Sequence, residues 1–192
     1  MASGKTHDKI TLIFSPLVAI IFLLLDISFF GKNGAIFLTL IGVASYIFGG
    51  YMFSGDLDIK SNEFKRWGKV KFIWIPYQRF FKHRSIFSNG FILGPLIRIL
   101  YLYSMFIIIF SLLYSFSIIK ISPPSIIKEN IKFILSNDKI FLNIFLALFI
   151  GSGLHTITDI ITTSFKKKTS SKKKNYKKKK IIKNKSIKCS YF

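Results

Sequence analysis

Cysteine and acidic residues are scarce in this chain of 192 residues, which has one Cys and 8 Asp and Glu. The single cysteine, Cys189, excludes a disulfide-stapled scaffold and a closed zinc site built from cysteines. Apolar residues make up 51% of the chain, and 29 Lys and Arg give a net charge of +21, with a mean hydropathy of +0.44. This high fraction of apolar residues excludes a disordered chain and disfavours a soluble nucleic-acid binder. The composition indicates a membrane protein with basic water-facing parts.

Several catalytic motifs are also missing from the sequence. It has no GxGxxG or Walker-type phosphate loop and no GxSxG elbow, and no His stands near Cys189 to activate the thiol. We therefore expect no nucleotide cofactor.

The basic charge is concentrated at the C-terminal end. Residues 166–192 hold 13 lysines and no acidic residue, which leaves +8 for the rest of the chain. Such a segment repels itself and has too little apolar surface to fold alone, so we expect a disordered cytoplasmic tail after a membrane-embedded domain of residues 1–165. Each lysine near an anionic surface contributes about 1 kcal/mol, so the expected partners of the tail are anionic lipid headgroups, with nucleic acid as the alternative.

Four stretches contain the roughly 20 mostly apolar residues that a helix needs to cross a bilayer. They are residues 10–30, 35–53, 91–119 and 140–162. The predicted fold class is therefore all-α: an integral membrane bundle of about four transmembrane helices, with a cytoplasmic interfacial loop and the basic tail. Gly31, Asn33 and Gly34 tolerate positive φ and suit a tight turn between the first two helices, and Pro123-Pro124 should stop the third.

The distribution of basic residues predicts the orientation in the lipid bilayer. Lys5 and Lys9, the loop 54–90 with eight basic and three acidic residues, and the tail all fall on one side of a four-span chain. Cytoplasmic loops carry the excess of Lys and Arg, so a multi-pass protein with both termini in the cytoplasm is predicted. Aromatic residues interleave with the basic ones in loop 54–90, which is typical of a segment lying at the lipid headgroups.

The same side collects all three histidines and four carboxylates. They are His7 and Asp8 before the first span, Asp56 and Asp58 after the second, His83 before the third, and His155 and Asp159 near the end of the fourth. Mixed His and Asp ligands suit zinc, manganese or iron, and this many ligands permits two metals. The sequence thus predicts a divalent metal site at the cytoplasmic face.

Each motif alone has a simpler interpretation. His155 and Asp159 are spaced i, i+4 on one helix face, which also suits a hydrogen bond between helices. Asp56-x-Asp58 resembles an ordinary turn or cap, His83-Arg84 a basic membrane-surface pair, and His7-Asp8 a helix cap. Their coincidence in one layer favours the metal site.

These motifs resemble a bacterial family of uncharacterised metal-binding membrane proteins. The resemblance covers roughly residues 2–166 and rests on the segments around His7, Asp56 and Asp58, His83, and His155 with Asp159. That family is in turn similar to membrane-bound metal-dependent hydrolases, which implies His7, Asp56, Asp58, His83, His155 and Asp159 as ligands or their supports, and phosphoester chemistry. The family typically has Ser-His-Gly after His-Arg-Ser, whereas this chain has Ser88-Asn89-Gly90.

Two functions remain open from the sequence. The first is a metal-dependent hydrolase of phosphoesters or lipid headgroups, in which Asp58 or Asp159 is the base and Arg84 holds a phosphate oxygen. The second is a non-catalytic metal-binding or structural membrane protein with an adhesive polybasic tail. A transporter is a weaker third hypothesis, in which His155 and Asp159 relay protons.

Overall fold

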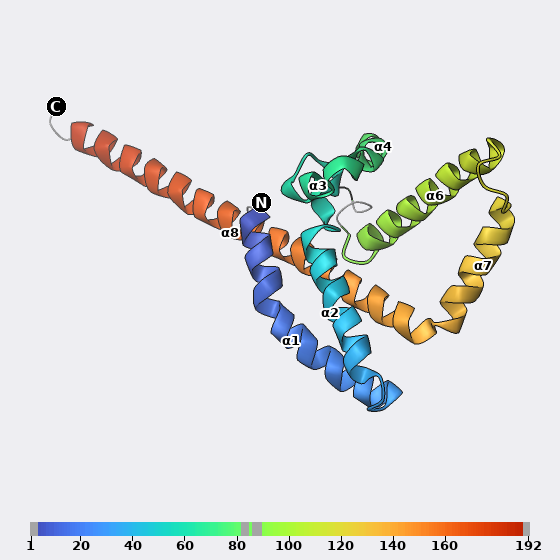
Figure 1. Cartoon of the computed structure of the whole chain (residues 1–192). Coiled ribbons are helices and arrows are strands. Elements are labelled where there is room, and N and C mark those ends of the chain that lie inside the picture. The colour runs from blue at the N-terminus through green and yellow to red at the C-terminus, as the bar shows by residue number, and fades with distance from the viewer. Residues whose placement is uncertain (1–3, 82–84, 86–89, 190–192) are drawn as a thin grey trace. The chain divides into compact units, whose positions relative to one another are not determined.

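The computed structural model describes residues 4–81, 85 and 90–189, and of residues 166–168 and 170–189 it describes the backbone alone. The described residues form helices and no strand, which confirms the all-α class. The elements are α1 (Gly4–Phe30), α2 (Ala35–Tyr51), the 3-10 turn η1 (Gly55–Asp58), α3 (Asn62–Arg66), the 3-10 turn η2 (Gly68–Ile73), α4 (Trp74–Phe80), α6 (Leu93–Ser115), α7 (Pro123–Ser136) and α8 (Asp138–Cys189). Figure 1 shows their order. The larger of two units is Ser3–Ile157, and the smaller contains the rest of α8 from Thr158 onward.

Within the described part of the chain, three helices are long and apolar enough to cross a membrane. They are Gly4–Phe30, Leu93–Ser115 and the first part of α8, Asp138–Phe165. α2 is apolar but has only 17 residues, which at 1.5 Å per residue is about 26 Å, against roughly 30 Å of hydrocarbon. Three of the four expected spans therefore have the required length and composition, and the fourth is shorter than expected.

α1 and α2 form an antiparallel hairpin, seen in Figure 1 as the dark blue helix and the light blue to cyan helix. The turn between them has Gly31 at φ 79° and Gly34 at φ 89°, which confirms the need for glycine there, because side chains disfavour this conformation. Pro16 lies within α1 and has no N–H for the carbonyl of Leu12. The Ser15 hydroxyl donates to that carbonyl at 2.8 Å instead.

Glycines let α2 and α8 approach within backbone contact. A Cβ on Gly151 of α8 would collide with the carbonyl oxygen of Tyr46, and a Cβ on Gly49 of α2 would lie 2.7 Å from the Leu148 carbonyl oxygen. Gly50 similarly leaves room for Thr11 of α1. This close packing brings α1, α2 and the first part of α8 together.

Part of the segment between α2 and α6 contributes to the core, which the prediction of an interfacial loop did not include. Trp74 and Tyr77 are fully buried and pack with Phe53, Leu57 and other apolar residues including Leu148 of α8. Phe72 and Phe80 remain exposed. The physical reason is that Trp74 and Tyr77 are three residues apart and so share one face of α4, and this face is buried.

The third span ends earlier than expected, at Ser115, and Pro123 and Pro124 open α7 instead of stopping α6. Proline is favoured at the first positions of a helix because those N–H groups have no partner within the helix. The backbone of residues 166–189 continues α8 as helix, which differs from the expected disordered tail. Lysine is a good helix former, and the apolar part of α8 has already nucleated the helix.

Candidate metal centre

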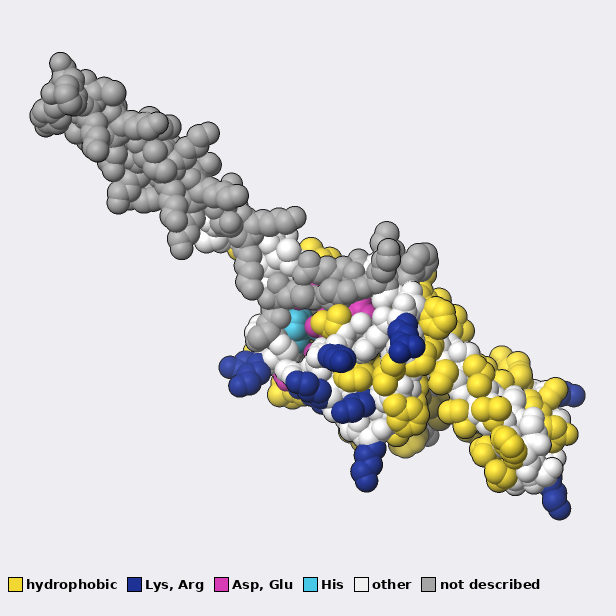
Figure 2. All heavy atoms as spheres, turned by 90° about the horizontal axis from the view of Figure 1, so that it is seen from above, with side chains coloured by type: hydrophobic (Ala, Val, Ile, Leu, Met, Phe, Trp, Pro, Cys, Tyr) yellow, Lys and Arg dark blue, Asp and Glu magenta, His cyan; other side chains and the backbone are white. Residues whose placement is uncertain are grey.

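His7 and His155 meet in the larger unit, although 148 positions separate them in the sequence. His7 lies in the first turns of α1 and is 2% exposed, and His155 lies in α8 and is 4% exposed. Their rings stack with centroids 3.7 Å apart at 22°, and the two side chains offer ring nitrogens within 4.8 Å of each other. In Figure 2 a histidine surface lies beside carboxylates, with Lys and Arg around them. The structure thus brings together two of the residues that the sequence analysis assigns to one layer.

Thr11 holds the backbone that carries His7. Its hydroxyl donates to the His7 carbonyl at 3.1 Å, and the Thr11 carbonyl accepts from the buried Tyr46 hydroxyl of α2 at 3.0 Å. Gly50 leaves space for this Thr11 side chain. The first turns of α1 are therefore tied to α2 near His7.

Asp56 reaches the same place from η1. Its Oδ2 is 3.6 Å from His155 Nε2, which is an ion-pair distance and too long for a hydrogen bond. Asp56 Oδ1 and both ring nitrogens of His155 are buried without a hydrogen-bond partner among the described residues. Gln78 of α4 fixes η1, because its amide donates to the carbonyls of Leu57 and Ile59, both at 3.0 Å.

The structure places the two other carboxylates as follows. Asp58, at the end of η1, is 4% exposed. Asp159 is half-buried and follows His155 by four residues in α8, so the helical repeat puts it on the same helix face one turn later. Asp159 lies beyond Ile157, the last residue of the larger unit.

Asp8 is engaged with Arg66, which removes it from the set of available ligands. The Arg66 guanidinium donates to both carboxylate oxygens, at 2.9 and 2.5 Å, and also to the Tyr51 carbonyl at 2.8 Å. The hydrogen bonds that Arg66 donates to Asp8 raise the pKa of the guanidinium, which stays charged. This bidentate pair joins the start of α1 to α3 beside His7.

Arg98 supports the centre and was missed by the sequence prediction. It is fully buried in α6, where its guanidinium donates to the Gly94 carbonyl, the Phe53 carbonyl and Ser152 Oγ. Phe53 lies just before η1, and Ser152 lies one turn before His155. A single charge in an apolar stretch signals an inward-facing side chain, but the sequence does not reveal its partners.

The donor set fits a divalent metal ion. Two buried imidazoles lie beside a half-buried carboxylate. Among the described residues, the His155 nitrogens and Asp56 Oδ1 lack the hydrogen-bond partners that buried polar atoms normally have. Imidazole and carboxylate together suit zinc, manganese or iron. His83, Arg84 and Asn89 lie outside the described residues, so their places in the predicted site stay predictions.

Comparisons with known proteins agree with metal binding. The family model "Uncharacterized metal-binding protein (DUF2227)" matches residues 2–169. An "Uncharacterized protein" of Aquifex aeolicus (strain VF5) is 40% identical over 58 residues, which are 30% of this chain and 40% of that protein. No solved structure matches the chain. These matches give no support to similarity with membrane-bound hydrolases. Since the family model covers most of its length, the chain belongs to the uncharacterized metal-binding protein family DUF2227.

Proposed function

We propose that this chain is an integral membrane protein that binds one divalent metal ion at the cytoplasmic end of its helices. The ligands would be His7, His155 and Asp56, with Asp159 as the further carboxylate on the His155 face of α8. The observation that carries the proposal is the stacked, buried pair of imidazoles next to Asp56, whose Oδ2 lies 3.6 Å from His155 Nε2 and whose Oδ1 has no hydrogen-bond partner among the described residues.

The membrane location is supported by surface composition as well as helix length. Large apolar side chains are exposed along the candidate spans, among them Ile13 and Leu24 of α1, Leu100 and Leu112 of α6 and Leu146 of α8. Exposed apolar residues in such numbers suit contact with lipid. The metal ligands belong to the end of the bundle where the basic segments gather, which supports the cytoplasmic orientation.

Elemental mass spectrometry on detergent-purified protein tests the metal site. We expect about one zinc, manganese or iron per chain in the wild type, a loss of most of it in His155→Ala, and a partial loss in Asp56→Asn. Glu129→Gln, which removes an exposed carboxylate on α7, is the matched control and should keep the metal. A wild type that binds no metal after incubation with each ion, or a His155→Ala variant that binds as the wild type does, would overturn the proposal.

The catalytic extension of this proposal is hydrolysis of a phosphoester or lipid headgroup. A bound divalent ion supplies Lewis acidity and lowers the pKa of a coordinated water toward about 7. Asp58, in the same turn as Asp56 and 4% exposed, is the candidate to accept a proton from the attacking water. Arg84 is the candidate to hold a phosphate oxygen through its fork of donors.

Asp58→Asn separates catalysis from metal binding. We expect this variant to retain its metal but to lose metal-stimulated release of phosphate or headgroup from a panel of phospholipids, relative to the wild type. If the metal-loaded wild type releases nothing across the panel, the protein binds metal without this chemistry, which is the non-catalytic alternative.

A further inference from the structure

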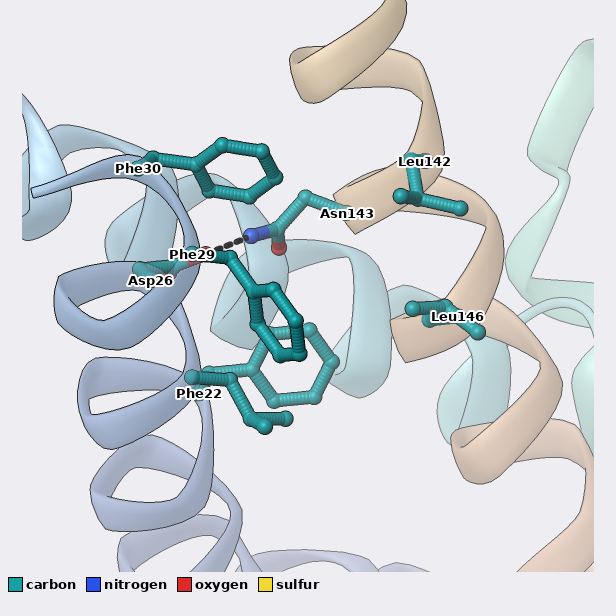
Figure 3. Close-up of a pocket in the computed structure, with 8 residues that line it drawn as sticks. Phe22, Asp26, Phe29, Phe30, Leu142, Asn143 and Leu146 are labelled. Atoms are coloured by element: carbon teal, nitrogen blue, oxygen red, sulfur yellow. Dashed lines mark hydrogen bonds between the residues drawn. The ribbon is translucent and has the colours of Figure 1, made fainter.

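A cavity of about 340 Å³ lies between α1 and α8, at the other end of α1 from His7. Apolar side chains form most of its wall, and Asp26 and Asn143 are its polar residues (Figure 3). The apolar residues are Phe22, Leu25, Phe29, Phe30, Leu142 and Leu146. The volume is within the range of roughly 300–1,000 Å³ that is usual for small-molecule sites. Asp26 follows His7 by 19 residues, about 28 Å along a helix, so the cavity is separate from the metal centre.

Asp26 is a buried carboxylate held by neutral donors. It is 2% exposed, and its two oxygens accept from the Thr39 hydroxyl at 2.9 Å and from the Asn143 amide at 2.6 Å. Among the residues that the structure describes, no Lys, Arg or His forms an ion pair with it. A carboxylate has about four lone-pair positions, so both oxygens can accept further bonds. A buried negative charge without a counterion is costly, and a cation in the cavity would compensate it.

The side chain of Asn143 has an oxygen that accepts no hydrogen bond from the described residues. The side chain is 4% exposed, and its Oδ1 has no hydrogen-bond partner in the described part of the chain. A Cβ on Gly42 would collide with this oxygen, so the glycine leaves the space that the amide occupies. Figure 3 shows the Asn143 side chain between the phenylalanines of α1 and the leucines of α8, with its nitrogen toward Asp26. The free oxygen favours a ligand that donates hydrogen bonds.

A lysine of the protein lies over one of the aromatic rings that line the cavity. The Lys139 ammonium lies 5.2 Å from the ring centroid of Phe30, which lines the cavity. The face of an aromatic ring carries partial negative charge, and so stabilises a nearby cation. Phe22 and Phe29 present further rings to the same cavity.

We propose that this cavity binds a hydrophobic amine, a protonated amine that carries an aryl or alkyl body. The ammonium group donates to Asp26 and to Asn143 Oδ1, and the apolar body packs against the phenylalanine and leucine walls. A neutral alcohol of the same shape satisfies Asn143 but leaves the Asp26 charge uncompensated. An anionic ligand is repelled by Asp26. The carboxylate, the unpartnered amide oxygen and the aromatic wall are thus all used by one ligand class.

Isothermal titration of detergent-purified full-length protein at neutral pH tests this site with 2-phenylethylamine and its neutral isostere 2-phenylethanol. We expect the amine to bind at least tenfold more tightly than the alcohol to the wild type. Asp26→Asn should reduce binding of the amine to the level of the alcohol. Glu129→Gln removes an exposed carboxylate outside the cavity and should leave the amine affinity unchanged.

Leu146→Trp provides a test that keeps Asp26 and decides the outcome if Asp26→Asn fails to fold. Leu146 is 49% exposed, so a larger side chain is tolerated there while it fills the cavity, and binding of the amine should be lost. The proposal is overturned if the wild type does not bind the amine, if amine and alcohol bind equally, or if either cavity variant folds and binds as the wild type does. Metal content is unaffected by these outcomes, so the two proposals fail separately.

Discussion

At the scale of single residues, Tyr77 makes the stability of the fold fall at alkaline pH. It is fully buried, and its hydroxyl has no hydrogen-bond partner among the described residues. Burial disfavours the phenolate and raises the pKa of Tyr77 from 10.0 to about 12. The folded state therefore holds this proton more tightly than the unfolded state. Its contribution to stability is complete below pH 10 and is lost as the pH rises from about 10 to about 12.

Chemical unfolding in detergent at pH 8, 10 and 11 measures this effect as a difference between wild type and Tyr77→Phe. The wild type should lose more unfolding free energy than the variant above pH 10, whereas Tyr103→Phe, at a 39% exposed tyrosine, should behave as the wild type. Identical pH dependence in wild type and Tyr77→Phe would contradict the buried phenol.

Arg98 is the residue whose loss should damage the fold most directly. In Arg98→Met the Phe53 carbonyl and Ser152 Oγ lose a charged donor in a buried place, which we expect to lower the unfolding free energy by about 2–4 kcal/mol. Arg79→Met, at an exposed arginine, should change it by less than about 0.5 kcal/mol. Denaturant unfolding followed by circular dichroism compares the two, and equal effects would refute the role given to Arg98.

The residues that could be predicted were those whose chemistry is unusual in an apolar chain. His7, Asp56 and His155 stood out because ionisable groups are rare at membrane depth, and helix order placed them at one end. The supports of the site could not be predicted, because Gln78 and Arg98 bind backbone carbonyls. Every residue has such a carbonyl, so the sequence gives no sign of which one is used.

At the scale of helices and turns, hydropathy and glycine predicted the α1–α2 hairpin and the cores of α6 and α8. The ends differed by a few residues because apolar runs continue beyond the last helical turn. α7 was not predicted as a helix, since two prolines and four lysines in residues 120–139 indicated a loop. The apolar residues of α7, such as Phe133 and Leu135, are exposed in the structure. The amphipathic pattern of α7 therefore does not mark a face that packs against the core.

The contact between α2 and α8 predicts a sharp cost for one added methyl group. In Gly151→Ala the new Cβ would collide with the Tyr46 carbonyl and lie 3.0 Å from the Gly50 nitrogen. Both obstacles are backbone, so the helices must move apart, and we expect a loss of about 1–3 kcal/mol in unfolding free energy. Gly4→Ala is the matched control because its Cβ meets the flexible Asn62 side chain. Thermal unfolding of both variants measures the difference, and an unchanged Gly151→Ala would rule out the close approach.

At the scale of the whole molecule, the number of membrane crossings decides where the termini lie. Four crossings put both termini on one side, while three would separate them if α2 does not cross. The chain has one native cysteine, Cys189, near its C-terminus. In intact cells a membrane-impermeant maleimide should leave Cys189 unlabelled and should label it in inverted vesicles.

A second variant reports the N-terminal side. Ser3→Cys in a Cys189→Ser background should show the same protection in intact cells and the same labelling in inverted vesicles. Labelling of one terminus from outside intact cells, with protection of the other, would mean three crossings and would place α2 within the protein on one side. The lipid or nucleic-acid partner of residues 166–192 remains a prediction.

Composition predicted the all-helical class and the candidate spans of the whole molecule because hydrophobic length is set by the bilayer. It did not predict that the segment between α2 and α6 contributes to the core. Trp74 and Tyr77 occur there among basic residues, and the same composition serves a headgroup-facing belt or a buried cluster. Packing against Leu148 of α8 distinguishes the two, and that contact is distant in sequence.

Pro16 divides α1 into two segments that contact different neighbours. In the second segment, Asp26 accepts hydrogen bonds from Thr39 and Asn143. The first segment begins at Gly4 and carries His7. Between them the Leu12 carbonyl is held by the rotatable Ser15 hydroxyl rather than by a peptide N–H, so bending is easiest there. The helix thus contains a joint that is held on both sides: Tyr46 and Arg66 fix the half that carries His7, and Thr39 and Asn143 fix the half that carries Asp26.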